Sequence, residues 1–209
     1  MFKNRTHAAE QLAALIDDHD IVADIVLAIP RGGLPVGRVV ADSLGVPLDV
    51  VVARKLGAPW NPEFAIGAVA SDGTLWLNEA VIDELGIADA DIAEQVSHEQ
   101  AAAQEKLERY RAGRPPLDVQ GQTVLLVDDG IATGATTTAC LRQLKQSGAA
   151  RVILAVPVAP PDTVERLHGE ADAVLCVETP PHFDAVGQFY ESFEQVSDAE
   201  AKSYLKPDE

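Results

Sequence analysis

The segment from Val124 to Ala139 constrains the fold of this chain most strongly, because it joins a buried strand to a helix through a polar loop. It reads VLLVDDGIATGATTTA. The apolar run that ends at Val127 predicts a buried strand, and two carboxylates, Asp128 and Asp129, follow it directly. A helical pattern begins among the threonines that follow. Such a strand–loop–helix unit is typical of an α/β protein with a parallel sheet.

The loop of this segment has the composition of a phosphate cradle. Glycines let a ligand approach the backbone, successive N–H groups can converge on an anion, and the helix that follows adds a favourable dipole. The loop lacks the lysine of the GxxxxGK[ST] nucleotide loop, which excludes that motif. We therefore expect these residues to bind a phosphate, with the threonine hydroxyls as extra donors: Gly130, Ile131, Ala132, Thr133, Gly134, Ala135, Thr136 and Thr137.

Two acids beside a phosphate site indicate a ligand whose two ends differ chemically. Asp128 and Asp129 would repel a phosphate, but carboxylates accept hydrogen bonds from neighbouring hydroxyl groups. A ribose 5-phosphate presents hydroxyls at one end and phosphate at the other. The motif therefore predicts a site for a sugar phosphate.

The complete motif resembles the signature that binds phosphoribosyl pyrophosphate (PRPP) in type I phosphoribosyltransferases. The resemblance implies a reaction in which a nitrogen nucleophile displaces pyrophosphate from C1 of PRPP, with Asp128 and Asp129 holding the ribose. It also implies a Mg²⁺ cofactor held mainly by PRPP, with the same two acids as its nearest protein ligands, and a homodimer. The sequence does not identify the acceptor, which we expect to be a nucleobase.

The apolar patterns along the rest of the chain alternate between strand and helix, which predicts a mainly parallel sheet with helices on both faces. We expect a phosphoribosyltransferase core over residues 1–177, with a lid and hairpin insertion at about 56–77, and a C-terminal hood with a final helix over 178–209. Main strands are predicted over 25–29, 48–53, 123–127, 151–156 and 173–177, and helices over 6–19, 34–44, 79–86, 89–110, 133–147, 161–168 and 198–204.

Two further segments resemble the part of the family site that binds pyrophosphate. The loop after the first strand contains Pro30-Arg31-Gly32-Gly33, and the resemblance implies a cis peptide between its first two residues. Arg54 and Lys55 follow the predicted second strand and would neutralise the leaving group, although a solvated basic pair is the alternative. The predicted pyrophosphate site is therefore Pro30, Arg31, Gly32, Gly33, Arg54 and Lys55, with Arg31 and Lys55 also catalytic.

The lid and the hood carry the weaker predictions. Gly, two prolines and Trp60 suit a mobile lid over residues 56–67, within which Glu63 resembles an acid of adenine-specific members. An exposed loop glutamate is an equally good interpretation of that residue. In the hood, aromatic side chains suit stacking on a planar base, or they pack the subdomain. The candidate acceptor residues there are His182, Phe183, Tyr190 and Phe193.

Two other functions remain open at this point. A PRPP- or nucleotide-sensing regulator could keep the same fold without catalysis, and a phosphate-ester hydrolase could use the two acids. The hood and lid favour the transferase over the regulator. The hydrolase lacks a recognisable nucleophile in the sequence.

The charge of the chain excludes one large class of partners. Acidic residues outnumber basic ones by 33 to 16, and the formal net charge is −17. Such a surface repels nucleic acid. The sequence also lacks an apolar run of the roughly 18 residues that a membrane span needs, and its first residues lack the apolar core of a signal peptide. We therefore expect a cytoplasmic protein without nucleic acid or membrane partners.

The excess of acids also leads to a prediction about salt. Self-repulsion of so many like charges is tolerated best where salt screens them, so we interpret the composition as adaptation to a high-salt cytoplasm. Thermal melts should show the melting temperature rising as KCl increases from about 0.1 M to about 1 M. Equal or greater stability in dilute buffer would indicate an ordinary acidic protein instead.

Overall fold

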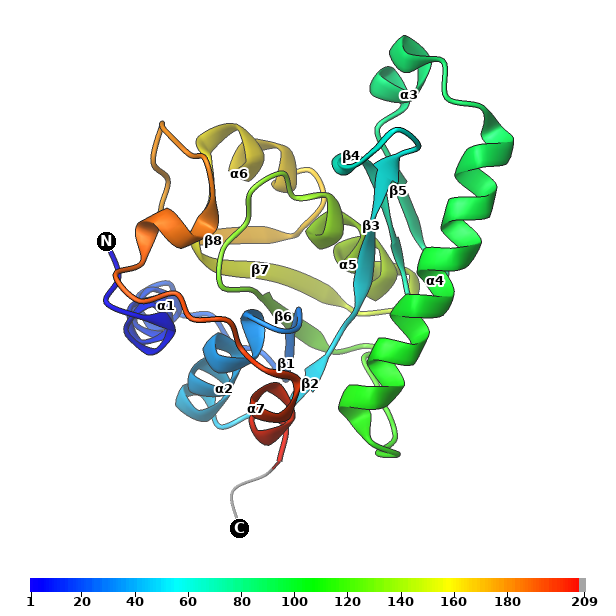
Figure 1. Ribbon diagram of the computed structural model, residues 1–209. Coiled ribbons are helices and arrows are strands. Elements are labelled where there is room, and N and C mark those ends of the chain that lie inside the picture. The colour runs from blue at the N-terminus through cyan, green and yellow to red at the C-terminus, as the bar shows by residue number, and fades with distance from the viewer. Residues whose placement is uncertain (207–209) are drawn as a thin grey trace.

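A computed structural model describes residues 1–206, apart from the side chain of Glu63. It confirms the α/β fold: the main sheet has five parallel strands in the order β2-β1-β6-β7-β8 (Figure 1). Their bounds are β1 Ile25–Ala28, β2 Leu48–Val50, β6 Thr123–Val127, β7 Arg151–Val158 and β8 Ala173–Glu178.

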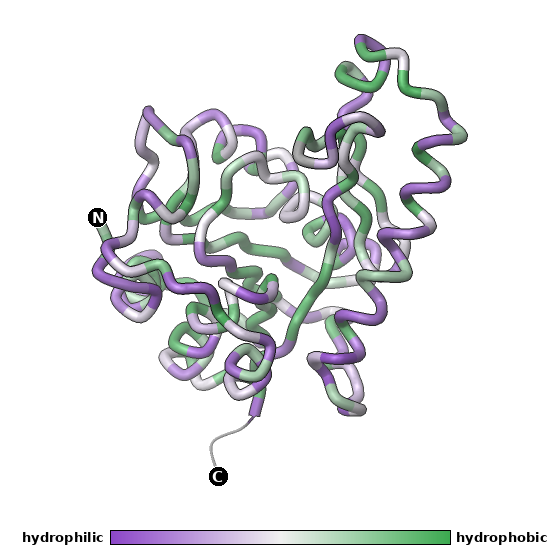
Figure 2. The backbone as a smooth tube through the Cα atoms, in the orientation of Figure 1, coloured by the Kyte–Doolittle hydropathy of each residue, from purple (hydrophilic) through white to green (hydrophobic). Residues whose placement is uncertain are grey.

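The central strand β6 shows why this sheet has two covered faces. Successive side chains of a strand point to opposite faces. Val124 and Leu126 therefore belong to one hydrophobic core. Leu125 and Val127 belong to the other, and all four side chains are completely buried. The hydropathy colouring shows the same apolar centre in the main sheet (Figure 2). A strand without a polar face requires helices on both sides.

The helices occupy the two faces as this burial requires. On one face, α1 (Arg5–Asp18) and α2 (Gly33–Leu44) contribute side chains such as Leu12 and Val40 to the core. On the other, α5 (Ala135–Gln146) and α6 (Pro161–Leu167) contribute Leu141 and Leu167. The phosphate loop and the loop after β1 both lie at the carboxyl ends of the strands, where α/β sheets bind ligands.

The segment predicted to be a lid forms regular secondary structure where the sequence indicated a loop, and its mobility stays a prediction. The strands β3 (Ala53–Ala58), β4 (Asn61–Ala70) and β5 (Leu75–Leu77) form a separate antiparallel sheet. Leu56 and Ile66 are buried in a small core with α3 (Glu79–Leu85), and burial stabilises the hairpin. The register of the β3–β4 ladder shifts at Gly57, one of the residues that suggested a loop. Glycine is required there, because a Cβ at this position would collide with the backbone of Pro62.

The second parallel strand is also shorter than predicted. It ends at Val50, and the chain enters the antiparallel sheet at Ala53. Arg54 and Lys55 therefore lie inside β3, and not at the end of a parallel strand. The continuous apolar run of residues 48–53 hid this change of sheet, because buried strands of either sheet have similar composition.

The C-terminal segment returns to the N-terminus. After β8 the chain forms a short 3₁₀ helix, η1 (Val186–Phe189), and later the helix α7 (Asp198–Ser203). The N–H of Phe2 donates to the Phe189 carbonyl at 2.7 Å, and Phe2 bridges to Tyr190. Figure 1 shows the blue N-terminal turn beside the orange C-terminal segment. None of the helices in residues 1–206 is long and apolar enough to cross a membrane.

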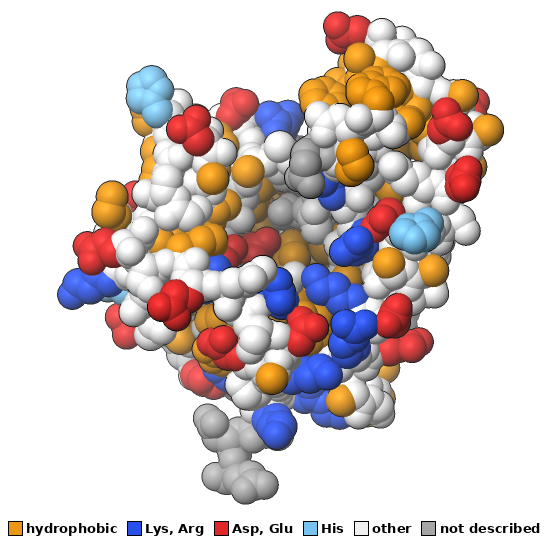
Figure 3. Space-filling view, in the orientation of Figure 1, with side chains coloured by type: hydrophobic (Ala, Val, Ile, Leu, Met, Phe, Trp, Pro, Cys, Tyr) orange, Lys and Arg blue, Asp and Glu red, His pale blue; other side chains and the backbone are white. Residues whose placement is uncertain are grey.

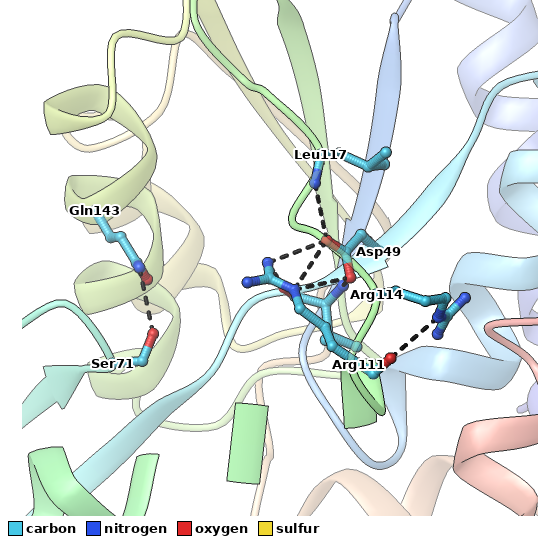
Figure 4. Close-up of polar contacts among 7 residues, drawn as sticks. Asp49, Ser71, Arg111, Arg114, Leu117 and Gln143 are labelled. Atoms are coloured by element: carbon cyan, nitrogen blue, oxygen red, sulfur yellow. Dashed lines mark hydrogen bonds and ion pairs between the residues drawn. The ribbon is translucent and has the colours of Figure 1, made fainter. Parts of the chain in front are cut away.

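A buried ion pair fastens the long helix α4 (Asp89–Arg111) to the main sheet (Figure 4). The Asp49 carboxylate, 7% exposed, accepts from the Arg111 guanidinium at 3.0–3.3 Å and from the N–H groups of Val50 and Leu117 at 2.8 and 3.3 Å. Helix α4 also packs against β3 and β4 of the antiparallel sheet. The ion pair therefore helps to fix the position of the antiparallel sheet relative to the main sheet.

Removing the arginine of this pair should destabilise the protein. In Arg111→Gln the Asp49 carboxylate remains buried without its counter-charge, which costs about 3 kcal/mol. Urea denaturation should show a lower midpoint with an unchanged slope. The exposed Arg151, replaced by glutamine, is the control and should change stability by less than about 0.5 kcal/mol. Equal midpoints for the two variants would contradict this assignment.

Candidate active site

The predicted site residues meet around a hollow between the C-terminal segment and the antiparallel sheet. Figure 3 shows Lys and Arg side chains gathered along one edge of this hollow, on a protein that is otherwise strongly acidic. The structure brings together four segments that are distant in sequence: the phosphate loop after β6, the loop after β1, the strand β3 and the helix α4.

The predicted phosphate loop opens α5, whose first helical residue is Ala135 where the sequence predicted Thr133. Gly134 precedes it with a φ of 76°, a left-handed conformation that favours glycine. Ala132 and Thr133 are exposed and Thr136 is partly exposed, whereas Thr137 is only 3% exposed. The accessible hydroxyls of the loop are therefore those of Thr133 and Thr136.

Side chains of α6 hold the carbonyl oxygens of this loop. Thr163 Oγ1 donates to the Ala132 carbonyl at 2.9 Å, and Arg166 Nη2 donates to the Thr133 carbonyl at 3.1 Å. Arg166 also donates to Thr163 Oγ1 at 3.0 Å. Because protein donors bind these carbonyls, the loop is held in one shape by α6. The sequence pattern did not indicate Arg166, because its distance of about thirty residues from the loop carries no periodic signal.

The two carboxylates after β6 have different surroundings. Asp128 is half-buried, and its Oδ1 accepts from the N–H of Asp129 at 2.8 Å. Asp129 is 9% exposed, and its Oδ2 accepts from Nε of Arg5 at 2.7 Å. Burial, and after it the carboxylate of Asp129, raise the pKa of Asp128 well above its usual value. Burial also raises the pKa of Asp129, and the Arg5 guanidinium opposes that shift.

The loop after β1 approaches these carboxylates closely enough to require its glycines. An ideal Cβ on Gly32 would lie 1.9 Å from Asp129 Oδ2, and one on Gly33 would lie 3.0 Å from the Val127 carbonyl oxygen. The peptide between Pro30 and Arg31 is cis, as the family resemblance implied. The predicted pyrophosphate loop and the acid pair therefore form one continuous surface.

The cations near this loop come from three elements. Arg31 lies 3.7 Å from Asp198 of α7, and Arg54 of β3 pairs with Glu99 of α4 at 2.7 Å. Lys106 of α4 donates to the Pro30 carbonyl at 3.1 Å. Lys106 was not predicted from the sequence, because it lies in a long polar helix whose charged residues otherwise indicate only a solvated surface.

A cavity of about 870 Å³ adjoins the exposed part of the phosphate loop. Lys55 and Arg166 contribute positive charge to its wall, and Trp76 and Phe64 contribute aromatic surface. A cavity of this size accommodates a small organic ligand. Lys55 thus lies beside the phosphate loop, although it reaches that position from the antiparallel sheet. The side chain of Glu63, the predicted lid acid, lies outside the described residues.

The hood aromatics that were candidates for base stacking pack mainly on one another. Tyr190 is 6% exposed, and its hydroxyl donates to the Asp129 carbonyl at 2.5 Å. Its ring lies 4.9 Å from that of Phe193, and Phe183 lies 4.8 Å from Phe189. His182 is exposed. This packing favours the alternative interpretation, in which the aromatics build the subdomain, for Tyr190, Phe193 and Phe183.

The acid pair provides oxygen ligands of the kind that hard cations bind. Asp128 and Asp129 supply carboxylate oxygens, which Mg²⁺ prefers. Within residues 1–206 no group of three or more His, Cys, Asp and Glu side chains is placed to hold a metal ion.

Known proteins are similar to this chain in sequence and in fold. The family described as "Phosphoribosyl transferase domain" matches residues 2–194. Two Mycobacterium tuberculosis proteins, from strains CDC 1551 and H37Rv and each named as a phosphoribosyl transferase, are 44% identical over 206 residues. That match covers 98% of this chain and 46% of each relative, so the chain spans about half the length of the curated relatives it matches.

Solved structures agree with this match. The crystal structure of TT1426 from Thermus thermophilus has a TM-score of 0.83 and 41% identity, covering 98% of this chain and 97% of that chain. The AQ2163 protein from Aquifex aeolicus shares the fold at a TM-score of 0.52 and 14% identity, over 84% of this chain and 74% of that chain. The chain belongs to the type I phosphoribosyltransferase family.

The surroundings of Lys106 lead to a prediction about pH. Burial, and then the guanidinium groups of Arg54 and Arg31, lower its pKa from the ordinary 10.5. The folded protein therefore binds this proton less readily than the unfolded chain does. The charged lysine destabilises the fold below its native pKa, and this penalty disappears as the pH rises to 10.5.

We expect Lys106→Met to be more stable than the wild type near neutral pH, with an advantage that shrinks as the pH increases. Denaturant titrations between about pH 7 and about pH 10 measure this. Methionine and lysine have similar helix propensities, so the substitution hardly changes the intrinsic stability of helix α4. The exposed Lys145, replaced by methionine, is the control and should show no such trend. An advantage that grows with pH would contradict the assignment.

Proposed function

We propose that the protein transfers the 5-phosphoribosyl group of PRPP to a nitrogen atom of a nucleobase and releases pyrophosphate. The observation that carries this proposal is the continuity of three surfaces. The phosphate loop follows the acid pair directly in the chain, and the cation-bearing loop after β1 packs against the same acids through Gly32 and Gly33. PRPP has a phosphate, a diol and a pyrophosphate in the same order.

In the proposed reaction the bond from C1 to the pyrophosphate oxygen breaks, and a bond from the acceptor nitrogen to C1 forms with inversion. The transition state has oxocarbenium character, as in glycosyl transfer generally. The loop from Gly130 to Thr137 anchors the 5-phosphate through its N–H groups and threonine hydroxyls. The carboxylate pair accepts hydrogen bonds from the ribose hydroxyls, which fixes the position of C1.

The leaving group requires positive charge, because negative charge develops on the departing pyrophosphate and its neighbours must offset it. Arg31, Arg54 and Lys106 supply this charge from three elements, and Lys55 adds positive charge beside the phosphate loop. Mg²⁺ bound to PRPP oxygens would add further charge neutralisation. The net charge of −17 makes this local concentration of cations more important, since the rest of the surface repels PRPP.

The acceptor is proposed to be a nucleobase because aromatic side chains line the cavity beside the phosphate loop. These side chains are Trp76 and Phe64. Planar rings stack on such surfaces. The homodimer and the high-salt cytoplasm belong to the same proposal, as extensions of the family resemblance and of the acidic composition.

A turnover assay tests this function. Pyrophosphate release should require PRPP, Mg²⁺ and one base from a panel of purines and pyrimidines, and EDTA should abolish it. Asp128→Asn should lower the rate by about 10²-fold, because the ribose loses a charged acceptor. Asp18→Asn, an exposed change on α1, is the matched control and should retain full activity.

The other outcomes identify the alternatives. Tight binding of PRPP without turnover on any base would favour a PRPP-sensing regulator. Release of inorganic phosphate without a base would favour a hydrolase. Failure to bind PRPP would contradict the proposed function itself.

A further inference from the structure

Helix α4 supports the loop after β1 at two neighbouring residues, Pro30 and Arg31. Lys106 Nζ donates to the Pro30 carbonyl at 3.1 Å, so the helix holds the backbone of the loop directly. Tyr110 follows one turn later on the same face of α4, and Lys106 Nζ lies 5.9 Å from the centre of its ring. The Tyr110 hydroxyl reaches the side chain of Arg31 through one intervening residue, Asp198 of α7.

The tyrosine holds Asp198 in a defined place. The Tyr110 hydroxyl donates to Asp198 Oδ1 at 2.9 Å, and its ring is buried in the main core, with 1% of the residue exposed. Two neighbours of Asp198 at the C-terminal end, Ala201 and Leu205, are buried in the same core. Close packing leaves a buried ring little freedom to move. The hydrogen bond therefore fixes one oxygen of a carboxylate that is otherwise only half-buried.

The carboxylate placed in this way faces two guanidinium groups. Arg31 Nη1 lies 3.7 Å from Asp198 Oδ1, and Arg109 Nη1 lies 3.6 Å from Asp198 Oδ2. The hydrogen bond from Tyr110 does most to lower the pKa of Asp198; burial opposes it, and the two guanidinium groups lower the pKa further. Arg31 approaches through Nη1, and a guanidinium carries several N–H donors, so Arg31 keeps donors for an anionic ligand.

The contact between Arg31 and Asp198 matters for order more than for stability, since a partly exposed ion pair stabilises a fold very little. A free arginine side chain loses rotamer freedom when it binds an anion, and that loss weakens binding. Asp198 restricts the guanidinium before the ligand arrives, and Lys106 holds the backbone from which Arg31 extends. Helix α4 thus preorganises both the backbone and the side chain of the loop.

We propose that Tyr110 and Asp198 are positioning residues for Arg31, and that they raise the affinity of the site for the pyrophosphate group of its ligand. Neither residue touches the ligand: Tyr110 holds Asp198, and Asp198 orients the guanidinium. The inference rests on the proposed function, because that function assigns pyrophosphate to the loop that contains Arg31. It extends the function by linking the leaving-group site to α4 and to the C-terminal helix α7.

The orientation of Arg31 is tested first without a ligand, by NMR relaxation of isotope-labelled arginine Nε–Hε groups. The Arg31 signal is assigned from its loss in Arg31→Lys. Tyr110→Phe removes the hydroxyl and keeps the buried ring, and Asp198→Asn removes the charge. Both variants should lower the order parameter of the Arg31 group, because each releases the same guanidinium. An unchanged order parameter in either variant would overturn the proposal.

Two substitutions in the C-terminal helix are matched controls. The Tyr204 hydroxyl donates to Glu200 Oε1 at 3.3 Å, which is also a bond from a tyrosine to a carboxylate in the first turn of α7. Tyr204→Phe removes that hydroxyl, and Glu200→Gln removes that charge. Neither should change the order parameter of Arg31, because their hydrogen bond lies outside the series of contacts from α4 to Arg31.

The effect on affinity is tested by calorimetric titration with PRPP and Mg²⁺. Tyr110→Phe leaves the charge of the site unchanged, and it should weaken PRPP binding by about three- to tenfold, the cost of ordering one long side chain. Ribose 5-phosphate is the comparison ligand, because it lacks the pyrophosphate, and its affinity should change by less than about twofold. Equal weakening for both ligands would overturn the proposal, since it would mean that the substitution loosens the whole site.

The pathway through the carboxylate is tested in a double variant. In an Asp198→Asn background, Tyr110→Phe should have almost no further effect on PRPP affinity, because the hydroxyl acts through the carboxylate. A full effect in that background would overturn the proposal. Tighter PRPP binding in Tyr110→Phe would overturn it too, because Asp198 would then compete with the pyrophosphate for Arg31. If the wild type binds no PRPP, the proposed function fails, and the NMR experiment still decides whether Tyr110 and Asp198 orient Arg31.

Discussion

Burial of the central strand β6 on both faces is the constraint on which the rest of this structure depends. Its four apolar residues cannot tolerate water on either side, so helices must cover the sheet completely. Polar residues can follow only where the strand leaves this core, at the carboxyl edge of the sheet. Asp128 and Asp129 are delivered there together with the phosphate loop, and the loop after β1 meets them because β1 pairs with β6 in parallel.

Basic side chains cluster at the candidate site, although the chain as a whole is acidic. The protein has an excess of seventeen negative charges, yet Arg31, Arg54 and Lys106 lie close enough together that two of them lower the pKa of the third. Like charges are costly to gather, and the pyrophosphate of the proposed substrate would offset that cost. Glu99 and Asp198 offset part of that cost within the protein itself.

The antiparallel sheet forms a second wall of the site. The sequence predicted a loop over residues 56–67, where the structure has parts of strands β3 and β4. Residues 56–67 contain the glycine and prolines of a loop, but their alternate side chains bury a small apolar core with α3 and α4. Tertiary burial outweighs local preference here, as it does for most short strands. Lys55 consequently faces the cavity beside the phosphate loop from a strand, and its position is set by a hairpin with hydrogen-bonded neighbours.

The sequence alone determined the α/β class, the phosphate loop, the acid pair and the family, because these depend on local patterns: an apolar run, adjacent acids and glycines that open a helix. Only the tertiary structure decided which partners these residues have. Arg5 lies 124 positions from Asp129, and Lys106 lies 76 positions from Pro30, so no periodicity relates them. Such contacts arise from packing of elements that are distant in the chain, and packing distinguishes two acids that are adjacent and identical in sequence.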